Sequence, residues 1–117
     1  MYTYKAKLIR VIDGDTIDAE IDLGFSVFVK QRIRLYGIDT PTSRSKNEEE
    51  KILGLGSKQC LTELLTSEFI VETILNKRGK FGRILGIIYS IDPETQETTN
   101  INDTLVERGF ANPYYLK

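Results

Sequence analysis

Alternation of apolar and polar residues predicts strands in the first third of the chain. The stretch TIDAEIDL (16–23) places Ile17, Ala19 and Ile21 between acidic residues, which is typical of a strand with one buried face. The segments 4–13 and 25–38 on either side are rich in β-branched and aromatic residues, and glycines mark the turns between them. The pattern therefore predicts a three-stranded meander whose third strand bends near Gly37.

The rest of the chain predicts two helices and two strands. After a polar segment (43–51), the apolar residues recur at helical spacing at Cys60, Leu61, Leu64 and Leu65. Strands are expected at 68–75 and 82–91, followed by a turn at 92–100 and a short helix at 100–110. For the short helix, we expect an N-cap at Asn102 or Asp103 and an end at Gly109.

Five strands with a helix between the third and fourth predict an α+β, mainly β, fold. The expected form is a mostly antiparallel, five-stranded oligonucleotide-binding (OB-fold) barrel with two or three packed helices. At 117 residues the chain is long enough for one core and too short for two, so residues 1–117 are expected to form a single domain.

Composition narrows the possible chemistry. The chain has one cysteine and no histidine, which excludes an internal disulfide and the usual zinc sites, so a metal would be a hard ion held by oxygen. A net charge of −1 gives no general attraction to nucleic acid, so short or single-stranded partners are favoured over long DNA. No apolar run approaches the roughly 18 residues of a membrane span. We expect a monomer without a membrane partner, cytoplasmic, or secreted if a leader is absent from this sequence.

Three aspartates and two arginines are the candidate site. Asp13 and Asp15 flank a glycine in DGDT, and Asp39 could meet Asp15 across neighbouring strands to give the two carboxylates that a hard cation needs. Alternatively, these acids only shape a β-turn and an Asx turn before a proline. On a straight strand Arg34 would point away from Asp39, unless the chain bends between them. With Arg83 in KFGR as a second guanidinium, the group would suit a phosphodiester.

Four motifs, taken in order, resemble the staphylococcal nuclease (thermonuclease) family. They are VIDGDT, RLYGIDTP, KFGR and LVERGFANPYY, and the resemblance runs from about Tyr4 to Tyr115. It implies an OB-fold barrel with packed helices and a calcium-dependent phosphodiesterase that cleaves DNA and RNA to 3′-phosphate ends. Carried over by motif, Asp15 and Asp39 would bind Ca²⁺ through carboxylates and Thr40 through its backbone carbonyl.

The resemblance also implies roles for residues around the ion. Asp13 would orient metal-bound water without touching the ion. Arg34 and Arg83 would grip the scissile phosphate, for which the planar guanidinium fork is suited. The nucleotide would be contacted by three residues: Lys80, Phe81 and Tyr115.

Thr42 departs from the family, which normally has a glutamate in the motif DTPE at this position. That glutamate is the usual candidate for the general base, whose work is typically worth about a hundredfold to ten-thousandfold in rate. Glu48, Glu49 or Glu50 could replace it, although a solvated charge run that caps the next helix explains them as well. Alternatively, calcium-bound hydroxide sustains a slow enzyme, or the domain is a non-cleaving binder of nucleotides or single strands, or a protein-interaction module. The retained acids favour bound metal, because carboxylates otherwise repel a polyanion.

Overall fold

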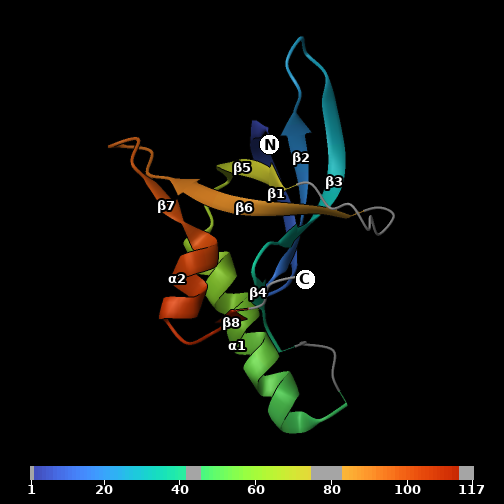
Figure 1. Ribbon diagram of the computed structural model, residues 1–117, viewed down its shortest axis with the longest axis vertical. Helices are drawn as coiled ribbons and strands as arrows, with labels where there is room; N and C mark the ends of the chain where they lie inside the picture. The colour runs from blue at the N-terminus through green and yellow to red at the C-terminus, as the bar shows by residue number, and fades with distance from the viewer. Residues whose placement is uncertain (1, 42–45, 75–82, 114–117) are drawn as a thin grey trace.

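The computed structural model is a closed barrel with two helices at one end (Figure 1). The structure describes residues 2–41, 46–74 and 83–113. Hydrogen bonding orders the barrel strands β3-β2-β1-β5-β6, and a further pairing of β3 with β6 closes the ring. Every pairing in this ring is antiparallel except the parallel β3–β6 closure. The strands are β1 (Thr3–Asp13), β2 (Thr16–Asp22), β3 (Phe28–Leu35), β5 (Glu68–Ile74) and β6 (Arg83–Ile91). The predicted five-stranded OB-fold barrel is confirmed.

Alternation along the strands fills the barrel interior. In β2, Ile17, Ala19 and Ile21 are buried while the acidic residues between them face outward. β3 and β5 contribute inward-facing residues in the same way. The largest side chains with no more than 2% exposure include Ile33, Leu35, Phe69, Val71, Ile88 and Leu105. The hydrophobic core therefore lies inside the barrel and continues to the helices.

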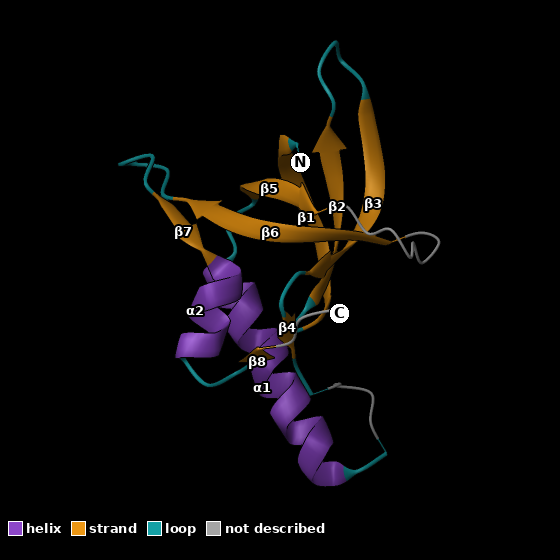
Figure 2. Cartoon of the chain, in the orientation of Figure 1, coloured by secondary structure: helices purple, strands orange, loops and turns teal. Residues whose placement is uncertain are grey.

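Two helices lie together at one end of the barrel (Figure 2). They are α1 (Glu48–Leu64) and α2 (Ile101–Glu107). The side chain of Asn47 caps α1 by accepting from the backbone N–H groups of Glu49 and Glu50. In the part of the chain that the structure describes, neither helix combines the length and apolarity needed to cross a membrane.

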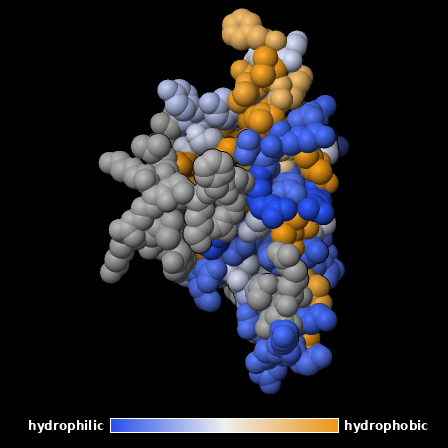
Figure 3. All heavy atoms as spheres, turned by 90° about the vertical axis from the view of Figure 1, so that its right-hand side faces the viewer, coloured by the Kyte–Doolittle hydropathy of each residue, from blue (hydrophilic) through white to orange (hydrophobic). Residues whose placement is uncertain are grey.

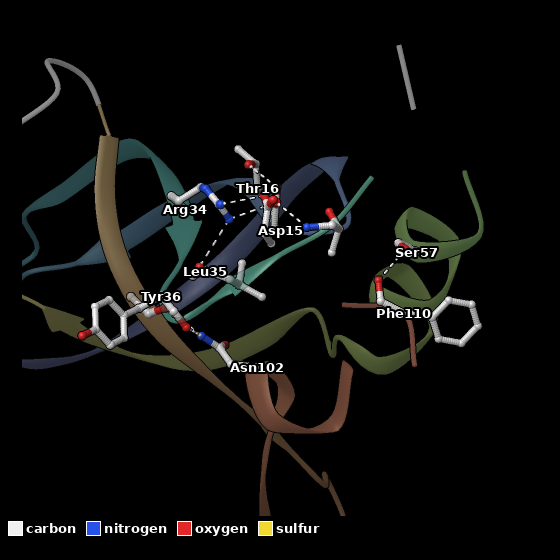
Figure 4. Close-up of polar contacts among 11 residues, drawn as sticks. Asp15, Thr16, Arg34, Leu35, Tyr36, Ser57, Asn102 and Phe110 are labelled. Atoms are coloured by element: carbon white, nitrogen blue, oxygen red, sulfur yellow. Dashed lines mark hydrogen bonds and ion pairs between the residues drawn. The ribbon is translucent and has the colours of Figure 1, made fainter. Parts of the chain in front are cut away.

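Asn102 corrects one prediction about α2. The cap of α2 is Asn100, whose side chain accepts from the N–H of Asp103, and Asn102 is instead 3% exposed within the first turn. Its side-chain oxygen accepts from the N–H of Ile88 at 3.1 Å, and its amide donates to the carbonyl of Tyr36 at 2.8 Å (Figure 4). Asn102 thus connects α2, β6 and the turn after β3, because buried backbone groups need partners.

Three short strands refine the predicted boundaries. They are β4 (Ile38–Asp39), β7 (Thr98–Asn100) and β8 (Asn112–Pro113). The strand predicted at 25–38 is interrupted at both ends, because Phe25 and Ser26 have positive φ in the hairpin and Gly37 turns with φ of 80°. The turn predicted at 92–100 is too long, since its last three residues pair with β6 as β7.

Replacing Asn102 with alanine tests its structural role. The change leaves the N–H of Ile88 and the carbonyl of Gly86 buried without the Asn102 side chain, and the part-buried carbonyl of Tyr36 also loses it. We therefore expect the unfolding free energy to fall by about 2–3 kcal/mol. Urea denaturation measures this loss. Asp103→Asn, at the exposed neighbouring position, is the control and should change little. Equal midpoints for the two variants would contradict the role given to Asn102.

Candidate functional site

Asp15 lies in a two-residue turn that α1 holds in place. Asp13 pairs with Thr16, so only Gly14 and Asp15 occupy the turn between β1 and β2. A Cβ on Gly14 would lie 2.6 Å from Cβ of Ser57 and 3.0 Å from its carbonyl carbon. Ser57 itself donates through Oγ to the carbonyl of Phe110 at 2.6 Å (Figure 4). The glycine is therefore required for close approach to α1, and this contact fixes the backbone beside Asp15.

The guanidinium of Arg34 contacts two carboxylates at once. Its Nη1 lies 2.9 Å from Oδ2 of Asp15 and its Nη2 lies 3.2 Å from Oδ1 of Asp39. The side chains of Arg34 and Asp15 are 16% and 10% exposed, whereas that of Asp39 is 60% exposed. The turn at Gly37 brings β4 back toward β3, so the bend that the sequence permits does place Asp39 on the side of Arg34.

Further donors orient the carboxylate of Asp15. The hydroxyl of Thr16 donates to Oδ1 at 2.9 Å, and the backbone N–H of Thr40 donates to Oδ2 at 3.1 Å. The backbone of Asp15 also accepts from the N–H of Leu35 at 2.8 Å. The β1–β2 turn, the end of β3 and the end of β4 therefore meet at Asp15.

The oxygen atoms around Asp15 fit a hard divalent ion. Asp15 and Asp39 both contact the guanidinium of Arg34. The hydroxyl of Thr40 is buried with no hydrogen-bond partner within residues 2–41, 46–74 and 83–113. Ca²⁺ takes six to eight oxygen ligands, including carboxylates, carbonyls and water. Among the described residues, no group of three or more His, Cys, Asp or Glu side chains converges on one point. An ion here would therefore use two carboxylates and complete its shell with backbone oxygen and water.

The electrostatics of this group also favour a further cation. Two carboxylates surround one guanidinium, so Asp15, Asp39 and Arg34 together carry one net negative charge. Such a site repels a phosphate unless more positive charge is added. A divalent ion would reverse the sign and make the site attractive to an anion.

The other predicted residues are distributed more widely. Arg83 begins β6, and its backbone pairs with Arg32 of β3, which brings it to the strand that carries Arg34. Asp13 ends β1, directly before the turn formed by Gly14 and Asp15. The acids of 48–50 are exposed in the first turn of α1, at the end of the molecule away from the barrel (Figure 1). Four predicted residues lie outside the described part of the chain: Thr42, Lys80, Phe81 and Tyr115.

A second charged cluster close to Arg34 was not predicted. Asp18 of β2 accepts from Nε of Arg10 at 3.0 Å and from Nε of Arg32 at 2.9 Å. The hydrogen bond from Arg32 is the main reason that the pKa of Asp18 lies below its usual value, and Arg10 adds to the effect against partial desolvation. Alternation identifies these residues as outward-facing, but only the strand register shows that they are neighbours.

Replacing Gly14 with alanine tests the contact between α1 and the turn. The new methyl would overlap Ser57, and relieving that overlap typically costs about 1–3 kcal/mol of stability. Gly56→Ala is the control, because its Cβ would be 3.6 Å from the ring of Phe110, at an ordinary contact distance within α1. Urea denaturation should show destabilisation only for the first variant. Equal stability of both would mean that α1 does not hold the turn.

Comparisons with known proteins agree with this architecture. The family model described as "Staphylococcal nuclease homologue" matches residues 32–117. The chain is 29% identical over 114 residues to a protein named "Micrococcal nuclease" from Shigella flexneri, covering 95% of this chain and 59% of that protein. It is 32% identical over 108 residues to an "Uncharacterized endonuclease" from Escherichia coli, covering 92% of this chain and 60% of the relative.

A third relative gives a similar picture. "Protein ParB" from Escherichia coli is 27% identical over 117 residues, which cover 94% of this chain and 57% of that protein. The chain thus spans somewhat less than two thirds of the length of these relatives. The family match, which includes Arg34 and Asp39, extends over most of the chain. The chain, with its barrel and its Asp15–Arg34–Asp39 site, belongs to the staphylococcal nuclease family.

Proposed function

We propose that this chain is a calcium-dependent phosphodiesterase that hydrolyses DNA and RNA to 3′-phosphate products, with weakened general-base catalysis. The observation that carries the proposal is the guanidinium of Arg34 held between Asp15 and Asp39. The names of the nuclease and endonuclease relatives support the reaction class. The metal is inferred from the donor set and the slow rate from Thr42, whereas the 3′-phosphate products are what the resemblance to the staphylococcal nuclease family implies.

The charge of the site explains why the proposed reaction needs calcium. Asp15 and Asp39 occupy two donor groups of Arg34, and the three side chains carry net negative charge. Calcium, when bound, supplies positive charge that offsets both carboxylates and polarises the attacking water. Arg34 can then donate to non-bridging phosphate oxygens, where negative charge gathers in the transition state. Burial of Arg34 strengthens this interaction, because water screens it less.

The general base is the weak part of the proposed site. Thr42 carries a hydroxyl that does not accept a proton at neutral pH. The exposed acids at 48–50 lie in the first turn of α1, where negative charge stabilises the helix N-terminus. We therefore propose slow hydrolysis without a dedicated carboxylate base. A non-cleaving binder of nucleotides or single strands is the second candidate, and the residue at position 42 is what favours it.

The identity of residue 42 gives the first functional prediction. Thr42→Glu should raise the calcium-dependent cleavage rate of a labelled oligonucleotide by about a hundredfold to ten-thousandfold, since it supplies a general base. Thr42→Gln is the control, because it has similar size without basicity, and it should not accelerate cleavage. Replacing Glu48, Glu49 and Glu50 together with glutamine tests a substitute base. A large loss of rate in this triple variant would overturn the proposal that no carboxylate base operates.

Arg34 gives the second functional prediction. Arg34→Lys keeps the positive charge but loses the paired donors, so cleavage should fall by about a hundredfold or more.

A nucleoside 3′,5′-bisphosphate should raise the melting temperature of the wild-type chain only when calcium is present. If the bisphosphate and calcium together stabilise the chain but no cleavage occurs, the chain is a binder and not an enzyme. If the ligands neither stabilise the chain nor are cleaved, a protein-interaction module is favoured and the proposal is rejected.

A further inference from the structure

The outer face of the barrel carries a row of charged residues that runs across its strands. Arg10 of β1 lies opposite Asp18 of β2, and Asp18 lies opposite Arg32 of β3. In the backbone register, Arg32 is paired in turn with Arg83 of β6. Ile17 and Ile33, next in sequence to two of these residues, are fully buried, so alternation directs Asp18 and Arg32 to the outer face.

The Asp18 carboxylate holds both arginines at once. Arg32 donates through Nε to Oδ1 at 2.9 Å and through Nη2 to Oδ2 at 3.3 Å, while Arg10 donates through Nε to Oδ2 at 3.0 Å. The arginine side chains are 65% exposed at Arg10 and 42% exposed at Arg32, and that of Asp18 is 20% exposed. The carboxylate therefore sets the direction of two guanidinium groups that remain open to solvent.

This cluster has more donors and more positive charge than one carboxylate can satisfy. Each guanidinium has five N–H donors, and within the described ranges Arg10 donates a hydrogen bond only through Nε. Two positive charges against one negative charge leave the cluster net positive, in a chain whose formal net charge is −1. An ion pair that served stability alone would need one arginine, since the second adds like-charge repulsion. A second anion would satisfy the remaining donors.

The cluster lies one step along β3 from the proposed phosphate site. Arg32 and Arg34 are two residues apart on the same strand and face, so their Cα atoms are separated by about 6–7 Å. That spacing allows neighbouring phosphates of one extended strand to meet the two arginines in turn. Lys30 and Phe28 continue the same face of β3 toward the hairpin, and Phe28 is 55% exposed.

The sequence of groups along this face favours a single strand over a duplex. In Figure 3, which looks at the side of the molecule where β3 lies, hydrophilic side chains cover the middle and hydrophobic ones gather at the tip. Cations followed by an exposed aromatic ring match the charged groove and stacking surface that bind single-stranded nucleic acid. In a duplex the base faces are already stacked and cannot cover Phe28.

We infer that Arg10, Asp18 and Arg32 form a binding site for the backbone phosphate next to the scissile one in a single-stranded nucleic acid. The inference rests on the proposed function, because Arg34 defines the scissile position. Asp18 acts as a positioning residue that aligns the two arginines. The nucleic-acid strand then runs along β3 from Arg34 toward Phe28, which gives the substrate a fixed path across the barrel.

Binding of two ligands tests the inference. The first is a fluorescent single strand of about 10 nucleotides with phosphorothioate linkages that resist hydrolysis, and the second is a nucleoside 3′-monophosphate, both with calcium. Arg10→Ala should weaken binding of the strand about tenfold and lower the slope of log affinity against log salt by about 0.7. Its affinity for the monophosphate should not change, because the single phosphate of that ligand binds at Arg34.

A folding check on Arg10→Ala and two further variants separate the effect of the cluster from those of unfolding and of net charge. Arg10→Ala leaves the hydrogen bonds between Arg32 and Asp18 in place, so the fold should persist, and thermal unfolding verifies this. Arg108→Ala removes an equal charge from the end of α2 and should affect neither ligand. Asp18→Asn should weaken strand binding although it makes the chain more positive, an effect opposite to that of charge alone.

The outcomes distinguish the inference from the proposed function. If the monophosphate binds with calcium and Arg10→Ala binds the strand as tightly as wild type, the inference fails and the proposed function stands. Equal losses in Arg10→Ala and Arg108→Ala would reduce the effect to net charge and also overturn the inference. If neither ligand binds the wild-type chain, both fail.

Discussion

The buried contact between Asp15 and Arg34 is the interaction on which the site depends. Both side chains are largely shielded from water, so removing Arg34 would leave the Asp15 carboxylate without its counter-charge. The contact also joins parts of the chain that are distant in sequence, because Asp15 lies after β1 and Arg34 lies near the end of β3. Asp39 adds a second carboxylate from β4. The geometry of the site is therefore a consequence of the β2–β3 pairing, which sets Arg34 opposite Thr16, and of the turn at Gly37.

Two packing constraints keep the strand ends in this arrangement. α1 approaches Gly14 so closely that no side chain fits between the helix and the turn, while Asn102 satisfies backbone groups of β6 and of the turn after β3. Neither residue contacts the carboxylates directly. They act by limiting where the backbone of Asp15 and of the β3–β4 turn can lie, which is how a small barrel positions charges on loops.

The outer face of the barrel combines stability with recognition. Asp18 takes part in cross-strand ion pairs of the kind that modestly stabilise a sheet. The same carboxylate leaves two guanidinium groups oriented and incompletely satisfied beside Arg34. A chain without overall positive charge can in this way attract a polyanion locally. The acidic site and the basic cluster are neighbours, so the positive charge lies next to the position proposed for the metal.

Local pattern in the sequence was sufficient for the barrel strands and for α1, because burial of one strand face and one helix face imposes periods that can be counted. The ordered motifs were sufficient for the family, and glycine at position 37 permitted the bend toward Asp39. Strand register, by contrast, depends on partners distant in the chain, so the Arg10–Asp18–Arg32 cluster appeared only in three dimensions. The same holds for Asn102, whose polar character suggested a cap at the surface until α2 packed it against β6. Only the assembled structure determined which polar residue would be exposed and which would be buried.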